Sequence, residues 1–438
     1  MIFRQFVDED LGCGSYLVGD TEAAAAVVVD PSFGIEQYLE AAAAAGVRIV
    51  RVLETHTHAD HVSGHGRFAL EHGVPTSIHP IAEPEYPYDA LADGEIVEVG
   101  AVRIRVIHTP GHRPEHCAFV VDEQLALTGD SLFVGDAARP DLAVAAREGA
   151  TELFHSLEKL AGLPDGVAVY PGHVAGSLCG TKMSPDRSTT IGKERSGNPA
   201  LAFRDLQEFV LATATVATPR PPTTERVVGL NRGPWVALPE EPERVDDSGD
   251  ATVLDVRPVA DHLAGHVPGA INVPLDGGSF GTKAAFVVDA DEPLALQARS
   301  PEEARAAARR LWAVGIFSAR TYVVDAAATE TLAEIDVAAL KRLLDEDAVQ
   351  LVDVREPYER DTGYVPGSRN VPYRLLRRSR GDALDATKPI VTICESGARA
   401  VIAASVLQSE GFDATAVAHG GVHDFPELVT FRRCGGAS

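Results

Sequence analysis

The stretch THTHADHVSG, residues 55–64, places four residues of metal-ligand type, His56, His58, Asp60 and His61, within six positions. It follows the apolar run RVLE, which has the composition of a strand. Alternate residues at the end of a strand point the same way, so the first two imidazoles can converge on one ion. Asp60 and His61 fall in the following turn. The pattern predicts a metal site at a strand end.

Three more residues of ligand type occupy similar places later in the chain. His112 ends the run HTPGH, Asp130 ends LALTGD and His173 ends VYPGH, each after a predicted strand. Seven such residues at strand ends predict that they line one sheet edge and bind metal. Most other histidines are expected to be solvated, among them His65, His72, His79, His108 and His155.

Length and composition indicate several packed domains. The 438 residues exceed what one core ordinarily holds, and 45% hydrophobic with 24% charged residues is typical of globular proteins. The formal net charge of −25 excludes nucleic acid and anionic membrane surfaces as expected partners, because both would repel the chain. The N-terminal residues are acidic where a signal peptide needs an apolar core, which predicts a cytoplasmic location.

The five cysteines, Cys13, Cys117, Cys179, Cys394 and Cys434, are scattered and form no CxxC pair. This spacing is typical neither of a disulfide framework nor of a structural zinc knuckle. A cysteine with a special role is therefore expected to act alone.

The C-terminal half contains an internal repeat. VLDVRPVADHLAGHVPGAINVP, residues 253–274, returns 98 positions later as LVDVREPYERDTGYVPGSRNVP, residues 351–372. Each copy continues into helix-rich sequence, which predicts an α/β unit with a mostly parallel sheet. The proline-rich segment TPRPPTTERV, residues 218–227, is predicted to be loop or linker near the boundary before the repeat. Three domains are expected.

The second copy carries a candidate nucleophile. Cys394 ends the predicted strand PIVTIC, and a helix begins a few residues later. A helix N-terminus and a ring of backbone N–H groups favour a thiolate and can bind an anion, so Cys394 is predicted to be reactive. In the first copy, Ala298 aligns with Cys394 and Glu303 with Arg399. That copy has no nucleophile and is interpreted as a scaffold.

These motifs resemble two known families. HTHADH with the later GH, GD and GH pairs resembles the metallo-β-lactamase superfamily, which implies a four-layer αββα sandwich with its metal site along one edge of the paired sheets. DVRE, VPGSRNVP and a loop with four residues between Cys394 and Arg399 resemble rhodanese sulfurtransferases. Their combination resembles bacterial persulfide dioxygenase–rhodanese fusions. The expected domains are a persulfide dioxygenase domain at 1–238, an inactive rhodanese-like domain at 245–330 and an active rhodanese domain at 335–438.

The resemblance implies that a low-molecular-weight thiol persulfide is oxidised by O₂ to sulfite and free thiol. One Fe(II) per chain would be bound by His56, His112 and Asp130, a set that leaves positions for a thiolate and for O₂. The other four ligand-type residues would be hydrogen-bond partners of these ligands or a second metal site: His58, Asp60, His61 and His173.

The resemblance also implies that Cys394 and Arg399 are catalytic and that Cys394 carries sulfur as a persulfide, exchanging it with sulfite and thiosulfate. The intervening loop residues would bind the substrate: Glu395, Ser396, Gly397 and Ala398. Arg139, in a segment that looks like the substrate side of persulfide dioxygenases, is a candidate anchor for a carboxylate of the carrier thiol. The carrier itself is left open, and Cys179 lies near the expected pocket.

Two other functions are compatible with the residues. The seven ligands would also suit a dinuclear zinc thioester hydrolase of the glyoxalase II type, so zinc is the alternative metal. A non-enzymatic sulfane-sulfur sensor would use Cys394 without turnover. The sequence is compatible with a homo-oligomer but does not define an oligomeric state.

Overall fold

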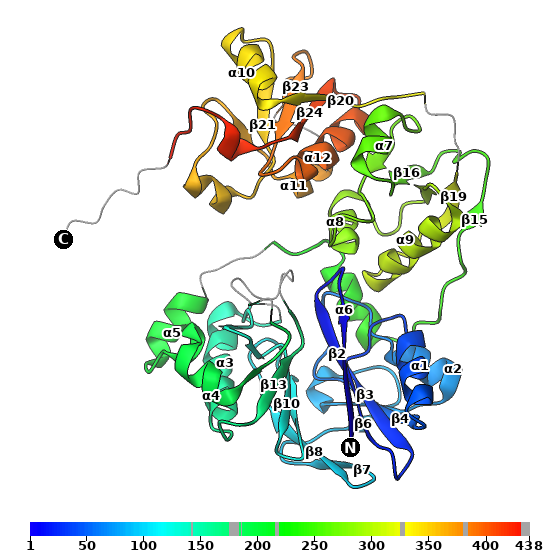
Figure 1. The fold of residues 1–438 in the computed structure, drawn as a ribbon, viewed down its shortest axis with the longest axis vertical. Helices are drawn as coiled ribbons and strands as arrows, with labels where there is room; N and C mark the ends of the chain where they lie inside the picture. Colours follow the sequence, from blue (N-terminus) through cyan, green and yellow to red (C-terminus); the bar gives the residue numbers. More distant parts are fainter. Residues whose placement is uncertain are drawn as a thin grey trace, which may run out of the picture. The chain divides into compact units, whose positions relative to one another are not determined.

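A computed structural model describes residues 1–141, 143–174, 184, 186–214, 219–324, 329–379 and 384–430. Cys179 and Cys434 lie outside these residues. The chain divides into two compact units (Figure 1). The first contains Met1–Pro239 with Trp312–Gly315, and the second contains Glu240–Leu311 with Ile316–Ser438.

The first unit contains two six-stranded sheets. The first sheet has the order β1 (Ile2–Asp8), β2 (Cys13–Asp20), β3 (Ala25–Val29), β4 (Arg48–Leu53), β5 (Thr76–Ile78), β6 (Asp89–Ala90). The second has the order β14 (Thr189–Thr190), β13 (Ala168–Pro171), β10 (Leu125–Gly129), β9 (Cys117–Val121), β8 (Val102–His108), β7 (Ile96–Val99). A short hairpin of β11 (Leu132–Phe133) and β12 (Asp136–Ala137) follows β10.

Helices cover the outer faces of both sheets (Figure 1). They are α1 (Glu36–Ala44) and α2 (His65–His72) beside the first sheet, and α3 (Ala146–Ala161), α4 (Ile191–Gly197) and α5 (Leu206–Thr213) beside the second, with short 3₁₀ turns at η1 (Pro80–Ala82) and η2 (Pro199–Leu201).

Alternate side chains of β3 point into two different apolar cores, which explains why both faces of the first sheet are covered. Val27 and Val29 belong to the apolar core between the sheets, whereas Val28 belongs to the core under α1. Successive side chains of a strand point to opposite faces, so a run of buried valines must be covered on both sides. A third core lies between the second sheet and α3, around Val120 and Leu153. The αββα sandwich predicted from the sequence is confirmed.

The proline-rich segment 218–227 is only partly the loop predicted from the sequence, because α6 (Thr224–Arg232) begins inside it. Its three prolines all precede Thr223, where a helix has not yet begun. The following residues TERVVGLNR contain no proline and can form the helix, so the prolines limit only its start.

The second unit contains two five-stranded parallel sheets in which the strands follow equivalent orders. The first is β15 (Glu243–Arg244), β19 (Ala319–Val323), β18 (Leu294–Gln297), β16 (Thr252–Asp255), β17 (Ile271–Asn272), and the second is β20 (Ala333–Asp336), β24 (Ala414–His419), β23 (Ile390–Ile393), β21 (Gln350–Asp353), β22 (Arg369–Asn370). The helical elements are α7 (Val259–Ala264), α8 (Phe280–Val287), α9 (Pro301–Ala313), α10 (Val337–Asp345), η3 (Pro357–Thr362), α11 (Tyr373–Ser379), α12 (Ala398–Ser409) and η4 (Val422–Asp424).

The repeated DVR and N-VP motifs form the same hydrogen-bonded network in both copies. In the first copy, Arg257 pairs with Asp255, and Asn272 Nδ2 donates to the carbonyls of both residues. In the second, Arg355 pairs with Asp353, and the equivalent asparagine, residue 370, donates to both carbonyls. The sequence repeat is therefore a structural repeat, as predicted.

The two copies pack directly against each other within this unit. The backbone N–H of Asn272, on β17, donates to Ser405 Oγ of α12 at 3.0 Å. Arg377 Nη2 of α11 donates to Glu292 Oε2 at 2.7 Å. The first copy thus supports the helix that follows Cys394.

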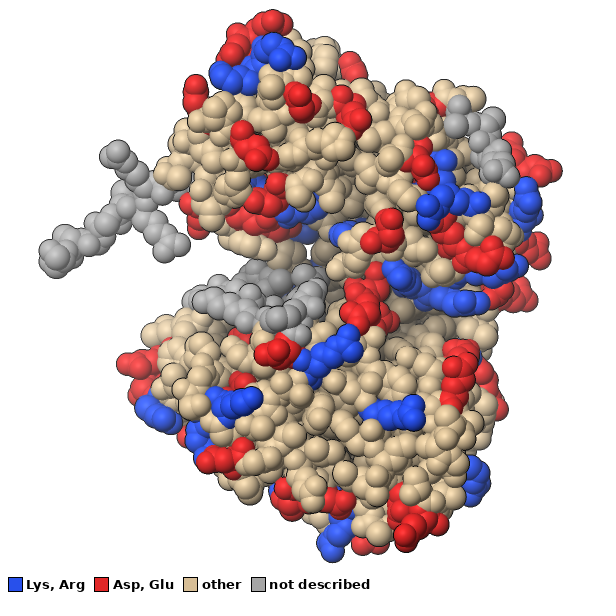
Figure 2. Space-filling view, in the orientation of Figure 1, with Lys and Arg blue, Asp and Glu red and all other residues tan. Residues whose placement is uncertain are grey.

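Each helix in the described part of the chain falls short of the length and apolar content that crossing a bilayer requires. On the face drawn in Figure 2, lysine and arginine side chains lie among aspartates and glutamates.

Candidate functional site

The strand ends of the first unit bring the predicted ligands together. His56 lies three residues after β4, His112 four after β8, Asp130 directly after β10 and His173 two after β13. All four side chains are buried. The residues that the sequence places after separate strands therefore meet in one region, because β10 and β13 are parallel neighbours and end at the same edge.

His56, His112 and Asp130 form one buried group of potential metal ligands. Each offers one ligand atom, and these atoms lie within 4.8 Å of one another. His112 Nε2 is 3.3 Å from Asp130 Oδ2. Among the described residues, His56 Nε2 and Asp130 Oδ2 are buried without a hydrogen-bond partner. Unsatisfied buried polar atoms are costly, and a cation between them would satisfy both. The donor set therefore fits a metal ion.

Hydrogen bonds on the opposite ring nitrogens orient these imidazoles. His112 Nδ1 lies 3.1 Å from the carbonyl oxygen of Arg139, to which it can only donate. His56 Nδ1 lies 2.8 Å from Thr55 Oγ1, and the Thr55 hydroxyl donates to Asp30 Oδ2 at 2.8 Å, so Oγ1 accepts from the ring. Each imidazole then carries its lone pair on Nε2, the atom nearest the cluster.

Electrostatics keep these side chains in their metal-binding forms. Burial lowers the pKa of His112, and burial together with neighbouring histidines lowers the pKa of His56 well below its usual value. Burial alone would raise the pKa of Asp130, but His173 outweighs it and the pKa is lowered. Neutral imidazoles and an ionised carboxylate are the forms that coordinate metal.

His58 contacts two carboxylates that were not predicted from the sequence. Its Nε2 lies 3.2 Å from Asp30 Oδ1 and 3.1 Å from Glu54 Oε2, while its Nδ1 is buried and has no hydrogen-bond partner in the part of the chain that the structure describes. Burial opposes protonation, but Asp30 and Glu54 raise the pKa of His58. Glu54 directly precedes THTH, yet no spacing rule marks a carboxylate there as a histidine partner.

His65 was expected to be solvated, and this prediction is wrong. The side chain is buried at the start of α2, and its Nδ1 lies 3.0 Å from Glu54 Oε1. Ser63 Oγ donates to the same carboxylate oxygen at 2.5 Å. The buried Glu54 carboxylate therefore has two histidine partners, His58 and His65. The residues around His65 in the sequence do not indicate this contact.

Asp60, His61 and His173 form a neighbouring group that also includes Cys13. His173 Nδ1 lies 2.7 Å from Asp130 Oδ1, and its Nε2 lies 2.9 Å from Asp60 Oδ2. Cys13 was not predicted as a site residue, since it is distant in sequence from the HTHADH motif. It enters because β2 begins beside His173.

Gly172 lets the C-terminal ends of strands β10 and β13 lie close together. A Cβ at this position would lie 2.6 Å from Asp130 Oδ1 and 2.9 Å from the carbonyl carbon of Gly129. Any side chain would push the strand ends apart, so the glycine of the GH motif has a packing reason.

In the second unit, Cys394 lies buried directly after β23, four residues before α12 begins. The backbone N–H of Gly397 donates to Cys394 Sγ at 3.2 Å. Gly397 has φ of +93°, and a Cβ there would collide with the carbonyl of Ala418. The loop therefore directs one backbone N–H at the sulfur, while Glu395, Ser396 and Ala398 are exposed.

Arg399 reaches Glu359 rather than the sulfur. Its Nη1 and Nη2 donate to the two carboxylate oxygens at 2.6 and 2.7 Å. Burial would lower the pKa of Arg399, but the hydrogen bonds from this pair raise it, so the guanidinium stays charged. Glu359, on η3, was not predicted, although it follows the DVRE motif closely.

Comparisons with known proteins show which family each part of the chain resembles. Residues 9–173 match the model of the metallo-beta-lactamase superfamily, and residues 239–327 and 336–427 each match the rhodanese-like domain. The N-terminal part of the chain is thus similar to the metallo-β-lactamase superfamily, and two rhodanese-like domains follow it.

Relatives of the lactamase-fold unit include enzymes of named activity. The mitochondrial persulfide dioxygenase ETHE1 of Bos taurus is 29% identical over 236 residues, which cover 53% of this chain and 87% of the relative. The Homo sapiens enzyme of that name is 29% identical over 244 residues, covering 55% and 91%. A metallo-beta-lactamase crystal structure from Staphylococcus aureus superimposes with a TM-score of 0.68 at 26% identity, covering 74% of this chain and 99% of that one.

Arg139 of the lactamase-fold unit is engaged within the protein. Its Nε and Nη2 donate to the Asp141 carboxylate at 2.7 and 2.8 Å, and its carbonyl accepts from His112. The predicted role as an anchor for a substrate carboxylate would need this guanidinium to leave Asp141 or to bind both groups.

The first rhodanese-like domain has no equivalent of Cys394. Ala298 is buried where the second domain has its cysteine, and Arg299 pairs with Glu303, its Nη2 donating to Oε1 at 2.6 Å. A carboxylate thus occupies the position of Arg399.

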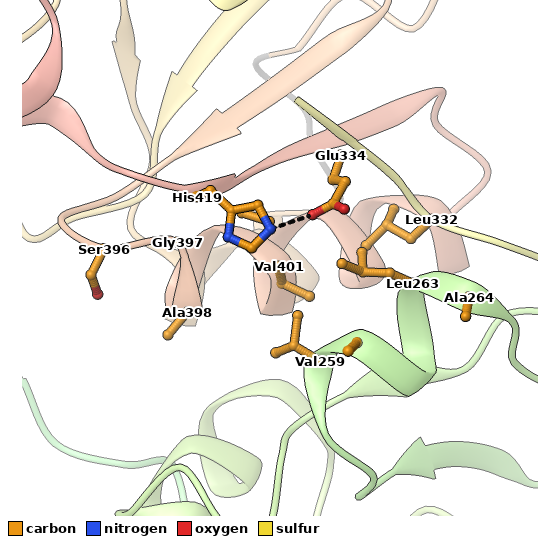
Figure 3. A pocket seen from close by; sticks show the side chains of 12 residues that line it. Val259, Leu263, Ala264, Leu332, Glu334, Ser396, Gly397, Ala398, Val401 and His419 are labelled. Carbon is orange, nitrogen blue, oxygen red and sulfur yellow. Dashed lines mark ion pairs between the residues drawn. The ribbon is translucent and has the colours of Figure 1, made fainter. Parts of the chain in front are cut away.

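A pocket of about 610 Å³ lies beside the Cys394 loop of the rhodanese-like pair. Val259 and Leu263 of α7, from the first domain, form part of its wall opposite loop residues 396–398 of the second (Figure 3). His419 Nε2 and Glu334 Oε2 form an ion pair at its edge, 3.4 Å apart (Figure 3). The domain without a nucleophile therefore helps to enclose space next to the loop that has one.

Proposed function

We propose that the lactamase-fold unit is an iron-dependent persulfide dioxygenase that converts a low-molecular-weight thiol persulfide and O₂ to sulfite and free thiol. Two observations support this: relatives named persulfide dioxygenase align with this unit, and His56, His112 and Asp130 make a set of two histidines and one carboxylate. That convergent, buried donor set carries the proposal, because such sets leave positions open for non-haem iron chemistry.

Bound Fe(II) would supply open coordination positions for the persulfide sulfur and for O₂. The chain's own residues prepare the site for it. Thr55 and the carbonyl of Arg139 fix the two imidazoles, and His173 holds Asp130 ionised. Burial of the ligands keeps bulk water from competing for them.

The reaction balances without a further oxidant. The terminal persulfide sulfur loses four electrons, and O₂ accepts the same four. With one water, both oxygen atoms of O₂ and the water oxygen supply the three oxygens of sulfite. The sulfur–sulfur bond breaks, and the carrier leaves as a thiolate that takes up a proton.

We further propose that Cys394 carries sulfur between donors and acceptors. Its thiolate attacks the sulfane sulfur of a donor, the bond between that sulfur and the rest of the donor breaks, and the donor leaves as an anion while Cys394 becomes a persulfide. Sulfite then attacks the outer sulfur of the persulfide, which forms thiosulfate and releases the Cys394 thiolate. The N–H of Gly397, donated to Sγ, supports this role, because backbone donors stabilise an anionic sulfur. Arg399, held by Glu359, would add positive charge at the rim. On this reading residues 335–438 are the active rhodanese domain, 245–330 the inactive one and 1–238 the dioxygenase domain.

The deciding experiment is anaerobic purification followed by metal analysis and O₂ uptake. We expect one iron per chain and, with persulfides of several low-molecular-weight thiols, one sulfite formed per O₂ consumed. Protein that binds iron and consumes no O₂ with any of these persulfides would refute the dioxygenase.

A second candidate function, a dinuclear zinc thioester hydrolase, is favoured by the grouping of Asp60, His61 and His173 next to Asp130. Two zinc ions per chain together with hydrolysis of a thioester, and no O₂ uptake with iron loaded, would establish it in place of the dioxygenase.

A further inference from the structure

We propose that Glu115 and His116 are positioning residues for the metal site formed by His56, His112 and Asp130, which we call the first site. Each accepts a hydrogen bond from the backbone of a segment that carries one of the other ligands. The inference rests on the proposed binding of metal at this site, and it applies whether that metal is iron or zinc.

His116 bonds the backbone of one ligand directly. The N–H of Asp130, the first residue after β10, donates to His116 Nε2 at 2.9 Å. Both residues are buried, and a buried N–H at the end of a strand needs an acceptor. The His116 ring also lies beside the ring of His56, with the two centroids 5.2 Å apart. One imidazole therefore adjoins two of the three proposed ligands.

The tautomer of His116 follows from its hydrogen bonds. A backbone N–H can only donate, so Nε2 carries the lone pair and the proton of the neutral ring is on Nδ1. Nδ1 lies 2.8 Å from Thr109 Oγ1, which accepts from it. The backbone N–H of Thr109 in turn donates to the carbonyl of His116 at 2.8 Å. Thr109 thus holds the ring in the orientation that presents Nε2 to Asp130.

Gly129 leaves room for this ring. It has a φ of +49°, and a Cβ there would lie 2.6 Å from His116 Nε2 and 2.9 Å from Thr55 Cβ. Any side chain would push the imidazole away from the N–H of Asp130. The position of His116 therefore explains the glycine of the GD motif.

Glu115 acts in the same way on the segment that carries His56. Its Oε1 accepts at 3.1 Å from the backbone N–H of Thr57, which directly follows His56. The same oxygen accepts from Arg113 Nε at 2.6 Å. Burial would raise the pKa of Glu115, but Arg113 lowers it, so the carboxylate remains ionised. An ionised acceptor makes the stronger hydrogen bond to the Thr57 N–H.

A short segment after His112 thus connects all three ligand segments. The residue that follows His116 continues the pattern, because the N–H of Cys117 donates to the carbonyl of Thr55 at 2.7 Å. His112 is itself the third ligand of the first site. These bonds fix the backbone around the ligands before an ion arrives, which lowers the cost of binding it.

Cobalt(II) binding to the metal-free full-length chain tests the role of His116, because the visible bands of cobalt report the geometry of its ligands. His112→Ala lacks a ligand of the first site, so the bands absent from that variant belong to this site. His116→Leu cannot accept from Asp130, and we expect it to lower cobalt affinity at the first site by about 10- to 100-fold and to alter these bands. His116→Gln, whose Oε1 can accept in place of Nε2, should restore both.

Two further variants separate positioning from a general loss of folding. His116→Asn can still bond Thr109 but is too short to reach Asp130, so it should weaken cobalt binding even if His116→Leu folds poorly. His262→Leu is the matched control, because His262 is an equally buried histidine in the other unit, with Nδ1 2.8 Å from Asp255 Oδ2. It should leave the affinity and the bands of the first site unchanged.

The equivalent pair for the second residue is Glu115→Gln and Glu115→Leu. Glutamine can accept from the Thr57 N–H, whereas leucine cannot. We therefore expect the leucine variant to lose cobalt affinity at the first site and the glutamine variant to retain most of it.

Amide hydrogen exchange of the metal-free protein gives a readout that needs no metal. The Asp130 amide should exchange faster in His116→Leu and His116→Asn than in wild type or His116→Gln. Unchanged cobalt affinity and bands in His116→Leu and His116→Asn would overturn the positioning role and leave the proposed metal site intact. A wild type with a protected Asp130 amide but no first-site bands would instead refute the metal site, and the inference with it.

Discussion

At the scale of single residues, the imidazoles of the proposed metal centre are positioned by hydrogen bonds on ring nitrogens that contact neighbouring side chains. The His56 ring reaches Asp30 through the Thr55 hydroxyl, and His58 reaches Asp30 directly. One buried carboxylate thus orients two histidines that are themselves two positions apart. The tautomer of each ring is decided by residues that never touch the ion.

Thr55→Val tests this arrangement. Valine keeps the shape of threonine but cannot accept from His56 Nδ1, so the ring loses its fixed tautomer. We expect metal affinity at the first site to fall by about 10- to 100-fold with the fold unchanged. Competition with a chelator measures the affinity, and unchanged affinity would show that Asp30 and Thr55 do not orient the ring.

His112→Ala and Asp130→Ala should each abolish iron binding and O₂ uptake, since either change removes a proposed ligand. Sulfur transfer by Cys394 from thiosulfate to cyanide should survive in both variants, because that residue belongs to the other unit. Full O₂ uptake in either variant would contradict the assignment of the ligands.

Asp141 gives a pH-dependent contribution to stability. Burial raises its pKa, but hydrogen bonds from Arg139 and Arg220 lower it to about 2. The unfolded carboxyl, with a pKa of about 3.9, binds protons more readily, so the contribution is full above about pH 4 and is lost as pH falls toward 2. We expect Asp141→Asn to cost about 1–2 kcal/mol at pH 7 and much less near pH 2.5. Denaturant unfolding at both pH values measures the difference.

A site residue could be predicted from the sequence only where the pattern that marks it lies close to it in the chain. The candidate ligands after β4, β8, β10 and β13 were predictable because each follows a strand within its own motif. Cys13 and Asp30 were not, since each meets the cluster through strand pairing or a side-chain contact at long separation. The alternation of apolar and polar residues indicates which face of a strand is buried. It does not indicate which residues from distant parts of the chain lie beside the end of that strand.

At the scale of elements, the Cys394 loop illustrates a motif whose parts depend on one another. Gly397 supplies both the donor to the sulfur and the left-handed backbone, and Arg399 is held by η3 through Glu359. The sequence predicted the strand, the loop and the helix here. It did not predict that α6 would start inside a proline-rich segment, because that helix is stabilised by Asn231 bonding the HTHADH turn.

Restoring a cysteine in the first rhodanese-like domain should not create a second sulfurtransferase. In an Ala298→Cys, Cys394→Ser double variant, Glu303 would stand where Arg399 stands in the active loop and would repel a persulfide anion. We expect thiosulfate sulfurtransferase activity at background level. Turnover comparable to wild type would mean that a cysteine alone suffices. The Ala298→Cys single variant, with Cys394 intact, is the control for folding.

At the scale of the whole molecule, two units with separate cores carry separate candidate chemistries. If both proposed activities are present, the sulfite from the lactamase-fold unit is a substrate for the proposed sulfur transfer at Cys394. Family matches and the sequence repeat both indicate this division. The arrangement of the units is a tertiary property on which the motifs carry no information.

The Cys394→Ser variant should form different sulfur products from wild type but should oxidise persulfide at an unchanged rate. With persulfide and sulfite both supplied, wild type should divide sulfur between sulfite and thiosulfate, whereas the variant should yield sulfite alone. Chromatography of both products decides the matter. Enzymatic thiosulfate from the variant would refute the carrier role, and loss of sulfite production would refute the independence of the metal site.

The shared Asp–Arg–Asn network of the two rhodanese-like domains has a consequence for how the first domain tolerates substitution. Both domains contain the same hydrogen bonds from Asn272 or Asn370 to the flanking strand carbonyls, although only the second has a cysteine in the following loop. The first domain also contacts α12, through the hydrogen bond from Asn272 to Ser405. Substitutions on its surface toward α12 should therefore disturb the second domain more than substitutions in the loop around Ala298.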